Sequence, residues 1–275
     1  TFIKLSPPPG EDIKHIFVNG SECEPYLTSD NRVMLEEPER IVEGLKILLH
    51  LFPKAKGYIG IEVNKPYALE KLKEYTKDEK NIVVCPLGTK YPQGSEKHLI
   101  YSILKKEVPR GKLPKDIECM VQNVDTVVAI WRAITMGRPI MRRIVTVGGD
   151  GVSNPCNIKV RLGTSYRELL EYAGWNPDET EKVISGGPMM GKALSTVDVP
   201  VVKGTAAILC FTKKITDTLP ESNCIRCNKC VDVCPCVLMP LVLNQDSLAR
   251  DTEAFLEHGG MDCMECGSCS YICPA

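Results

Sequence analysis

Several features of membrane, secreted and nucleic-acid-binding proteins are missing from this sequence of 275 residues. No apolar run approaches the ~20 residues that a helix needs to span a bilayer, so we expect no direct membrane span. No charged segment followed by an apolar one opens the sequence, so we expect no secretory signal. The formal net charge of −1 gives no indication of a nucleic-acid partner. There is also no Walker A motif and no G-x-G-x-x-G after a strand, so a standard dinucleotide-binding site is not supported.

Cysteine, in contrast, is abundant: there are 14, and eight of them fall in two copies of one pattern. Residues 224–235 read CIRCNKCVDVCP and residues 263–274 read CMECGSCSYICP, which are both C-x2-C-x2-C-x3-C-P. Clustered cysteines without a secretory signal favour metal sites over disulfides, and this spacing is typical of [4Fe–4S] clusters. The alternative is two zinc sites, but zinc ligands usually come as paired C-x-x-C motifs without the third cysteine and the Cys-Pro. Cys236 fits neither copy, and we expect a structural role for it.

In two-cluster proteins with this spacing, the fourth cysteine of each copy ligates the other cluster. We therefore expect two [4Fe–4S] clusters that exchange their fourth ligands. The expected sets are Cys224, Cys227, Cys230 and Cys273 for one cluster, and Cys263, Cys266, Cys269 and Cys234 for the other. Two clusters held close together are usual in proteins that transfer single electrons. The segment between the copies predicts one amphipathic helix with Leu241, Leu248 and Phe255 on its apolar side, so we expect helices to carry the clusters.

Strand-like and helix-like stretches alternate in residues 1–140, which predicts an α/β domain with a parallel sheet covered by helices on both faces. We expect strands at His15–Gly20, Gly57–Val63 and Asn81–Leu87, and helices at Pro38–Phe52, Tyr67–Tyr75 and Glu96–Lys106. Ligands of such sheets bind outside the carboxyl ends of the strands. The loop after the first strand carries short polar side chains and two carboxylates: Asn19, Ser21, Glu22 and Glu24. A solvated acidic loop is an equal alternative there.

The pattern changes after residue 141, where strand, turn, strand, helix and strand follow one another and predict a β-grasp module in residues 141–200. We interpret GGDG (Gly148–Gly151) as a hairpin turn rather than a phosphate-binding loop. GGPMMG (Gly186–Gly191) is either a cofactor-facing loop or a tight turn whose methionines fill a core, and we prefer the second.

Taken together, these stretches resemble the C subunit of the Rnf electron-transport complex and, more distantly, the flavin-bearing subunit of respiratory complex I. The matching motifs are VNGSECEPY, YPQGSEKHLI, NVDT, GTSYRELLEYAG, GGPMMG and both cysteine patterns, which span nearly the whole chain. The resemblance implies an FMN- and NADH-binding α/β domain (1–140), a β-grasp soluble-ligand-binding module (141–200) and a helical two-cluster ferredoxin domain (201–275). It also places a glycine-rich flavin loop immediately before Thr1, so we expect this sequence to be part of a longer protein.

The resemblance also assigns site residues. Flavin contacts are implied for Lys4, Asn19, Ser21, Glu22, Asn123 and Thr126. Glu24 would face the nicotinamide as the catalytic residue. Gly94 and Glu96 correspond to a Gly-Glu-Glu loop that contacts NADH, although Ser95 stands where that loop has an acid.

The implied function is electron transfer from NADH through FMN and then singly over two [4Fe–4S] clusters, which makes the chain an oxidoreductase subunit. Its partners would be the other subunits of a membrane-embedded, ion-translocating complex, with ferredoxin as an indirect redox partner. It would be a peripheral subunit on the cytoplasmic side of the cell membrane. Two alternatives stay open: a soluble NADH-dependent cobalamin (corrin) reductase, and a non-catalytic iron–sulfur relay or docking subunit.

Overall fold

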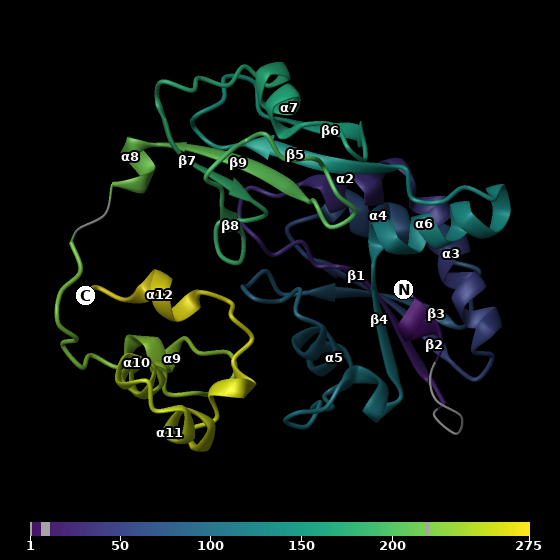
Figure 1. Cartoon of the computed structure of the whole chain (residues 1–275). Helices are drawn as coiled ribbons and strands as arrows, with labels where there is room; N and C mark the ends of the chain where they lie inside the picture. The colour runs from purple at the N-terminus through teal and green to yellow at the C-terminus, as the bar shows by residue number, and fades with distance from the viewer. Residues whose placement is uncertain (1, 7–11, 218–219) are drawn as a thin grey trace.

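The computed structural model describes residues 2–6, 12–217 and 220–275, which form three successive parts (Figure 1). The first part contains a parallel sheet with the strand order β3-β2-β1-β4. Its strands are β1 (His15–Gly20), β2 (Lys56–Glu62), β3 (Ile82–Leu87) and β4 (Cys119–Asn123). The predicted strands are therefore confirmed to within a residue at each end, and β4 completes the sheet.

The order of the strands creates a switch point between β1 and β4. The chain runs from β1 to β2 and β3 on one side and then crosses to β4 on the other side of β1. In parallel sheets of this kind, ligands bind in the crevice at the carboxyl ends of the two strands at the switch point. Asn19 of β1 and Asn123 of β4 are register partners at these ends, so two of the predicted flavin residues lie side by side at the switch point.

Helices cover both faces of the sheet, as predicted. They are the short α1 (Phe2–Leu5), α2 (Ser29–Glu36), α3 (Pro38–Leu51), α4 (Pro66–Tyr75), α5 (Glu96–Leu104) and α6 (Val124–Met136), with the 3-10 turn η1 (Pro114–Ile117). Alternation along β1 divides the core, because Ile16 and Val18 pack with α3 and α6 whereas Phe17 packs with Leu99 and Ile100 of α5. Helices α3 and α6 approach closely at Gly44, where a Cβ atom would lie 2.5 Å from a backbone oxygen of α6.

The second part is a mixed sheet with the order β6-β5-β9-β7-β8, packed against one helix. Its elements are β5 (Arg142–Gly148), β6 (Cys156–Arg161), α7 (Tyr166–Tyr172), β7 (Thr180–Ser185), β8 (Lys192–Ala193) and β9 (Ala207–Thr212). Strands β5 and β6 are antiparallel, which confirms the predicted hairpin. The boundary predicted at residue 200 needs correction, because β9 lies between β5 and β7 and extends this part to Thr212.

The third part is helical and follows the short α8 (Lys213–Thr216). It contains α9 (Lys229–Asp232), α10 (Pro240–Ala249), α11 (Thr252–Glu257), η2 (Gly260–Asp262) and α12 (Ser268–Ile272). The prediction of one amphipathic helix was wrong: Arg250 takes a left-handed conformation (φ 57°) and Asp251 caps α11 by accepting from Ala254 N at 3.0 Å. The apolar side differs too, since Leu248 is 76% exposed and Leu243 is buried instead.

The three parts are arranged so that the C-terminal helices lie on one side of the molecule, well away from α3 and α6 (Figure 1). The β-grasp part covers the top of the view in Figure 1, with β8 directed toward the C-terminal helices. Within the described residues, no helix combines the length and the apolar character needed to cross a bilayer.

Candidate functional site

The carboxyl end of β1 forms a compact polar turn at the switch point. Asn19 Nδ2 donates to the Gly94 carbonyl at 2.8 Å, and Asn19 Oδ1 accepts from Ser21 N at 3.0 Å. Only glycine fits at position 94, because a Cβ atom there would lie 2.5 Å from the Ser21 carbonyl oxygen. The Ser21 hydroxyl is buried and has no hydrogen-bond partner among the described residues. A buried hydroxyl without a partner is uncommon, and this one offers a donor and an acceptor to a ligand in the crevice.

An acidic network links this turn to the starts of α2 and α6. Glu22 accepts from the backbone N–H groups of Asp30 and Asn31 at 2.8 and 3.2 Å. Asn123 caps α6 by accepting from Asp125 N at 2.9 Å and donates to Asp30 Oδ2 at 2.6 Å. Burial raises the pKa of Glu22, and burial together with the Glu22 carboxylate raises the pKa of Asp30 to about 7. The network therefore contains an acid that exchanges its proton near neutral pH.

Lys4 and Glu96, which were predicted to contact different ligands, are partners of each other. Lys4 Nζ forms an ion pair with the Glu96 carboxylate and donates to the Val121 carbonyl of β4 at 2.8 Å. Both side chains are partly exposed, so either of them is accessible to an anionic or cationic ligand group. Thr126 lies half-buried in the first turn of α6, beyond the Asn123 cap.

Glu24 binds the β-grasp part of the same chain. Its carboxylate accepts from Met189 N at 3.1 Å and from Met190 N at 2.8 Å, both in the loop between β7 and β8. Gly187 is required for this contact, because a Cβ atom there would lie 2.2 Å from Glu24 Oε2. The interpretation that the methionines of this loop fill a core is wrong for Met190, which is 51% exposed. Glu24 thus holds the loop to the sheet edge, and its contact with a nicotinamide stays a prediction.

The first predicted cysteine set lines one small cavity. Cys224, Cys227, Cys230 and Cys273 surround a space of about 30 Å³, together with Leu241 and neighbouring residues. These are the four cysteines that the exchange of fourth ligands assigns to one cluster. All residues that line the cavity belong to the third part of the chain. The donor set is chemically suited to an iron–sulfur cluster, since it supplies four soft thiol ligands around one space.

The two cysteine copies share the same backbone turn. In each copy, the second and fourth residues after the first cysteine have positive φ angles: Arg226 (55°), Asn228 (62°), Glu265 (55°) and Gly267 (75°). In each copy, the backbone N–H of the second residue points at the first sulfur at 3.4 Å. Hydrogen bonds from backbone N–H groups to the sulfurs are among the features that set the potential of an iron–sulfur cluster. Among the described residues, no three thiol, imidazole or carboxylate groups converge on the position of a single metal ion.

The second cysteine set lies against the other two parts of the molecule. Tyr91 Oη donates to the Cys266 carbonyl at 2.7 Å, and His98 Nε2 lies 3.2 Å from the carbonyl of Pro235, directly after Cys234. A Cβ atom on Gly267 would lie 2.7 Å from the Met189 carbonyl oxygen. Since Met189 is bound by Glu24, the Cys263–Cys269 loop is fixed next to the polar turn at the end of β1.

Sequence reasoning did not identify several residues of this region. Tyr91 falls within one of the matched motifs, but its contact with Cys266 spans 175 positions and has no local signal. Burial raises the pKa of the Tyr91 hydroxyl, so that it remains a donor. Asp30 looks like an ordinary residue of a helical first turn. Cys236 is half-buried, and burial raises the pKa of its thiol, with a smaller contribution from neighbouring thiols of the second set. Its structural role stays a prediction.

Comparison with known proteins agrees with this division of the chain. Residues 1–132 match the Nuo51 FMN-binding domain, residues 144–193 the SLBB domain and residues 217–274 a 4Fe-4S dicluster domain. Two crystal structures of NAD+-reducing [NiFe]-hydrogenase, in the H2-reduced and air-oxidized states, share the fold with a TM-score of 0.61 at 18% and 19% identity. The match covers 74% of this chain and 41% of each hydrogenase chain. The expected fold class is confirmed.

Curated relatives confirm the resemblance that the motifs indicated. The C subunit of the proton-translocating ferredoxin:NAD(+) oxidoreductase complex of Clostridium ljungdahlii is 44% identical over 242 residues, covering 88% of this chain and 53% of the relative. The C subunit of the Na(+)-translocating ferredoxin:NAD(+) oxidoreductase complex of Acetobacterium woodii is 43% identical over 262 residues, covering 95% and 59%. The chain thus spans somewhat more than half the length of these relatives.

Proposed function

This chain belongs to the family of C subunits of ion-translocating ferredoxin:NAD+ oxidoreductase complexes, and we propose that it is an electron-transfer subunit of such a complex. In this proposal, FMN converts the two-electron chemistry of NADH into single electrons, which pass over two [4Fe–4S] clusters. The other subunits are membrane-embedded partners, ferredoxin is an indirect redox partner, and the chain is peripheral on the cytoplasmic side of the membrane. The match to an FMN-binding domain and a dicluster domain supports both cofactors.

The observation that carries the proposal is the contact between the cysteine-bearing loops and the sheet edge. Tyr91 and Met189 hold the Cys263–Cys269 loop beside the polar turn at the end of β1. The cavity of the first set is lined only by residues of the third part. We infer that a cluster held by the second set (Cys263, Cys266, Cys269 and Cys234) would lie nearer the flavin and would accept electrons before one held by the first set.

Residues at the switch point are suited to bind and orient a flavin. Asn19 and Asn123 are register partners at the switch point, and the Ser21 hydroxyl has unused hydrogen-bonding capacity. Gly94 allows the Ser21 carbonyl to pack directly against its backbone, which holds the polar turn in place. Asp30 is suited to hold a proton on its carboxyl group near neutral pH, because burial and the neighbouring Glu22 carboxylate raise its pKa to about 7. These polar groups supply binding and proton exchange at the edge where NADH chemistry is proposed.

Three residues assigned by resemblance, Glu24, Lys4 and Glu96, act differently in this proposal. Glu24 positions the β7–β8 loop through its bonds with the Met189 and Met190 amides, and only after that loop opens would its carboxylate be free for a nicotinamide. Lys4 and Glu96 neutralise each other, so a phosphate ligand would bind Lys4 in competition with Glu96. Gly94 keeps the polar turn packed against its own backbone. Thr126 lies in the first turn of α6, next to the switch point.

An anaerobic titration with NADH tests the proposal. The protein that carries this sequence is reconstituted with FMN and iron–sulfur, and flavin and cluster absorbance are followed together. We expect both bands to bleach as NADH is added. If the cluster band bleaches with dithionite but not with NADH, the chain is a relay or docking subunit and the proposal is wrong.

A further inference from the structure

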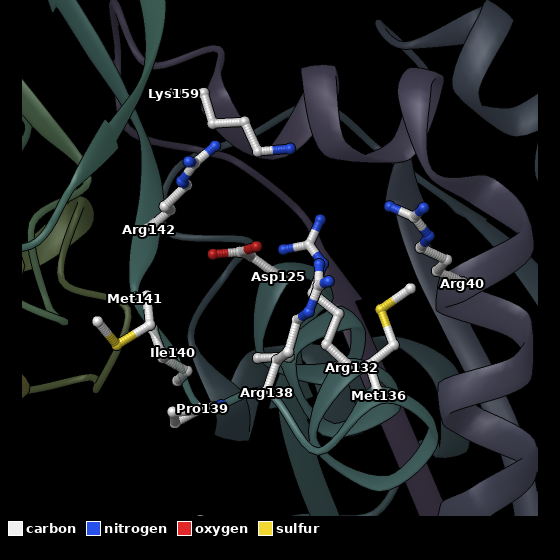
Figure 2. A pocket seen from close by; sticks show the side chains of 11 residues that line it. Arg40, Asp125, Arg132, Met136, Arg138, Pro139, Ile140, Met141, Arg142 and Lys159 are labelled. Atoms are coloured by element: carbon white, nitrogen blue, oxygen red, sulfur yellow. The ribbon is translucent and has the colours of Figure 1, made fainter.

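A basic cavity lies between the α/β part and the β-grasp part, on the side away from the cysteines. It measures about 440 Å³, which falls in the range of ligand-binding pockets. Its walls come from α3, α6, the segment that joins α6 to β5, the start of β5, and β6. Figure 2 shows basic side chains from these elements arranged around Asp125. None of the residues assigned to FMN, NADH or clusters lines it.

Positive charge dominates this cavity and the small cavity that adjoins it. The basic residues are Arg40, Arg132, Arg138, Arg142, Arg143 and Lys159, and the acidic residues are Glu37 and Asp125. Clustering like charges costs free energy unless an anion balances them. An excess of four positive charges around one space therefore indicates an anionic ligand with more than one negative charge.

Internal ion pairs use only part of this charge. Glu37 is bound by Arg40 at 2.7 Å and by Arg132. Burial acts to raise the pKa of Glu37, but these two guanidinium groups hold it below its usual value. Glu37 is therefore ionised at neutral pH. Its single negative charge is already shared by Arg40 and Arg132, so it does not neutralise the other arginines.

Several donors remain without partners. Within the part of the chain that the structure describes, neither Arg138 nor Arg142 has a carboxylate in salt-bridge range. Arg143 pairs with Asp125, yet its Nε–H is buried and bonds to none of the described residues. Lys159 lies 3.5 Å from Glu37, at the long end of an ion pair. A buried guanidinium N–H without an acceptor is costly, so an acceptor from outside the chain would complete the site.

The remaining wall of the cavity is apolar. Met136, Pro139, Ile140 and Met141 line it, and Figure 2 shows the last three together along one side. Met136 and Met141 are 45% and 63% exposed, although side chains of this size normally gain from burial. The ligand therefore needs an apolar portion as well as its charged groups.

We propose that this cavity binds a phosphate-bearing ligand with an apolar portion. Guanidinium groups match the oxygens of phosphate through paired N–H bonds, and each phosphate balances up to two of the unpaired charges. A soluble nucleotide and the headgroup region of an anionic lipid share this chemistry. The proposal does not rest on the redox function, because none of the residues that line the cavity is assigned to FMN, NADH or the clusters.

Binding measurements with defined probes test this site. Inorganic pyrophosphate and ADP are titrated by calorimetry into the 275-residue chain, and vesicles with and without phosphatidylglycerol are tested by co-sedimentation. The variant Arg138→Gln/Arg142→Gln removes the two unpaired guanidinium groups. Both side chains are exposed, so these substitutions should leave the core packing unchanged. The variant Lys203→Gln/Arg250→Gln removes the same charge at two exposed positions outside the cavity and serves as the matched control.

The expected result is binding of one probe class that the cavity variant weakens at least tenfold, because a charge-assisted hydrogen bond contributes that much. The control variant should bind like the wild type. Binding of ADP and pyrophosphate identifies a soluble ligand, and binding only to phosphatidylglycerol vesicles identifies a lipid. The proposal is overturned if no probe binds at low ionic strength, or if both variants weaken binding equally, since that reports general surface charge.

Discussion

The Glu24→Ala substitution should release the β7–β8 loop from the sheet edge while leaving the rest of the fold intact. In the structure, the Glu24 carboxylate accepts from the amides of Met189 at 3.1 Å and Met190 at 2.8 Å. Neither bond can be replaced by alanine, and Met190 is already half-exposed. The loop then loses its only described link to the turn after β1, apart from packing around Gly187.

The size of the effect follows from the chemistry of these two bonds. A hydrogen bond to a charged group contributes about 1.5–3 kcal/mol, and partial exposure places these at the lower end of that range. With two such bonds at about 1.5 kcal/mol each, local opening of the loop should become easier by about 3 kcal/mol, which corresponds to roughly 150-fold faster amide exchange. Hydrogen–deuterium exchange of the Met189 and Met190 amides measures this directly.

Two controls separate this effect from general destabilisation. The Leu194 amide, which donates to the Val183 carbonyl at 2.8 Å within the sheet, should exchange at the wild-type rate in the variant. Alanine at the exposed Glu181 should leave the loop amides unchanged. Equal exchange of Met189 and Met190 in Glu24→Ala and wild type would refute the assignment of Glu24 as a positioning residue.

Three further predictions concern the cysteines, the core and the acidic network. Serine at Cys227 or at Cys266 should lower bound iron from about eight to about four atoms per chain, and iron that stays at the wild-type level would contradict the ligand assignment. Alanine at Gly44 places Cβ 2.5 Å from a backbone oxygen and should cost about 1–2 kcal/mol in urea unfolding, whereas alanine at Gly204 meets nothing within 4 Å and should change stability by less than about 0.5 kcal/mol. The folded-state pKa of Asp30 is raised from 3.8 to about 7, so the stability of the wild type falls as pH rises through this window. The Asp30→Asn variant lacks this ionisation. Its melting temperature should therefore exceed that of the wild type by more at pH 8 than at pH 5. The same gain at both pH values would show that Asp30 does not titrate there.

The parts of this protein that could be predicted are those that depend on residues close together in the sequence. The short apolar run in His15–Gly20 predicted a strand, and the structure confirms that strand and divides Ile16 and Phe17 between the cores on its two faces. The cysteine spacing is also local, because three of the proposed ligands of each cluster lie within seven residues. In both cases neighbouring positions carry the information.

Contacts between distant segments were not predictable by the same means. Glu24 and Met190 are 166 positions apart, and nothing near Glu24 in the sequence identifies a partner in the β-grasp part. The basic cavity combines Arg40 of α3 with Lys159 of β6, whose separate neighbourhoods look like ordinary charged surfaces. The break at Arg250 was missed because the apolar spacing continues across it, while the left-handed residue and the Asp251 cap end the helix.

The order of the two cysteine sites is the central claim, and NADH reduction of two variants tests it most directly. In Cys227→Ser the remaining cluster belongs to the set beside Tyr91, and we expect NADH to reduce it at a rate close to that of the wild type. In Cys266→Ser the remaining cluster belongs to the cavity set, and we expect reduction by dithionite but slow or absent reduction by NADH. Fast NADH reduction in Cys266→Ser together with slow reduction in Cys227→Ser would contradict the account.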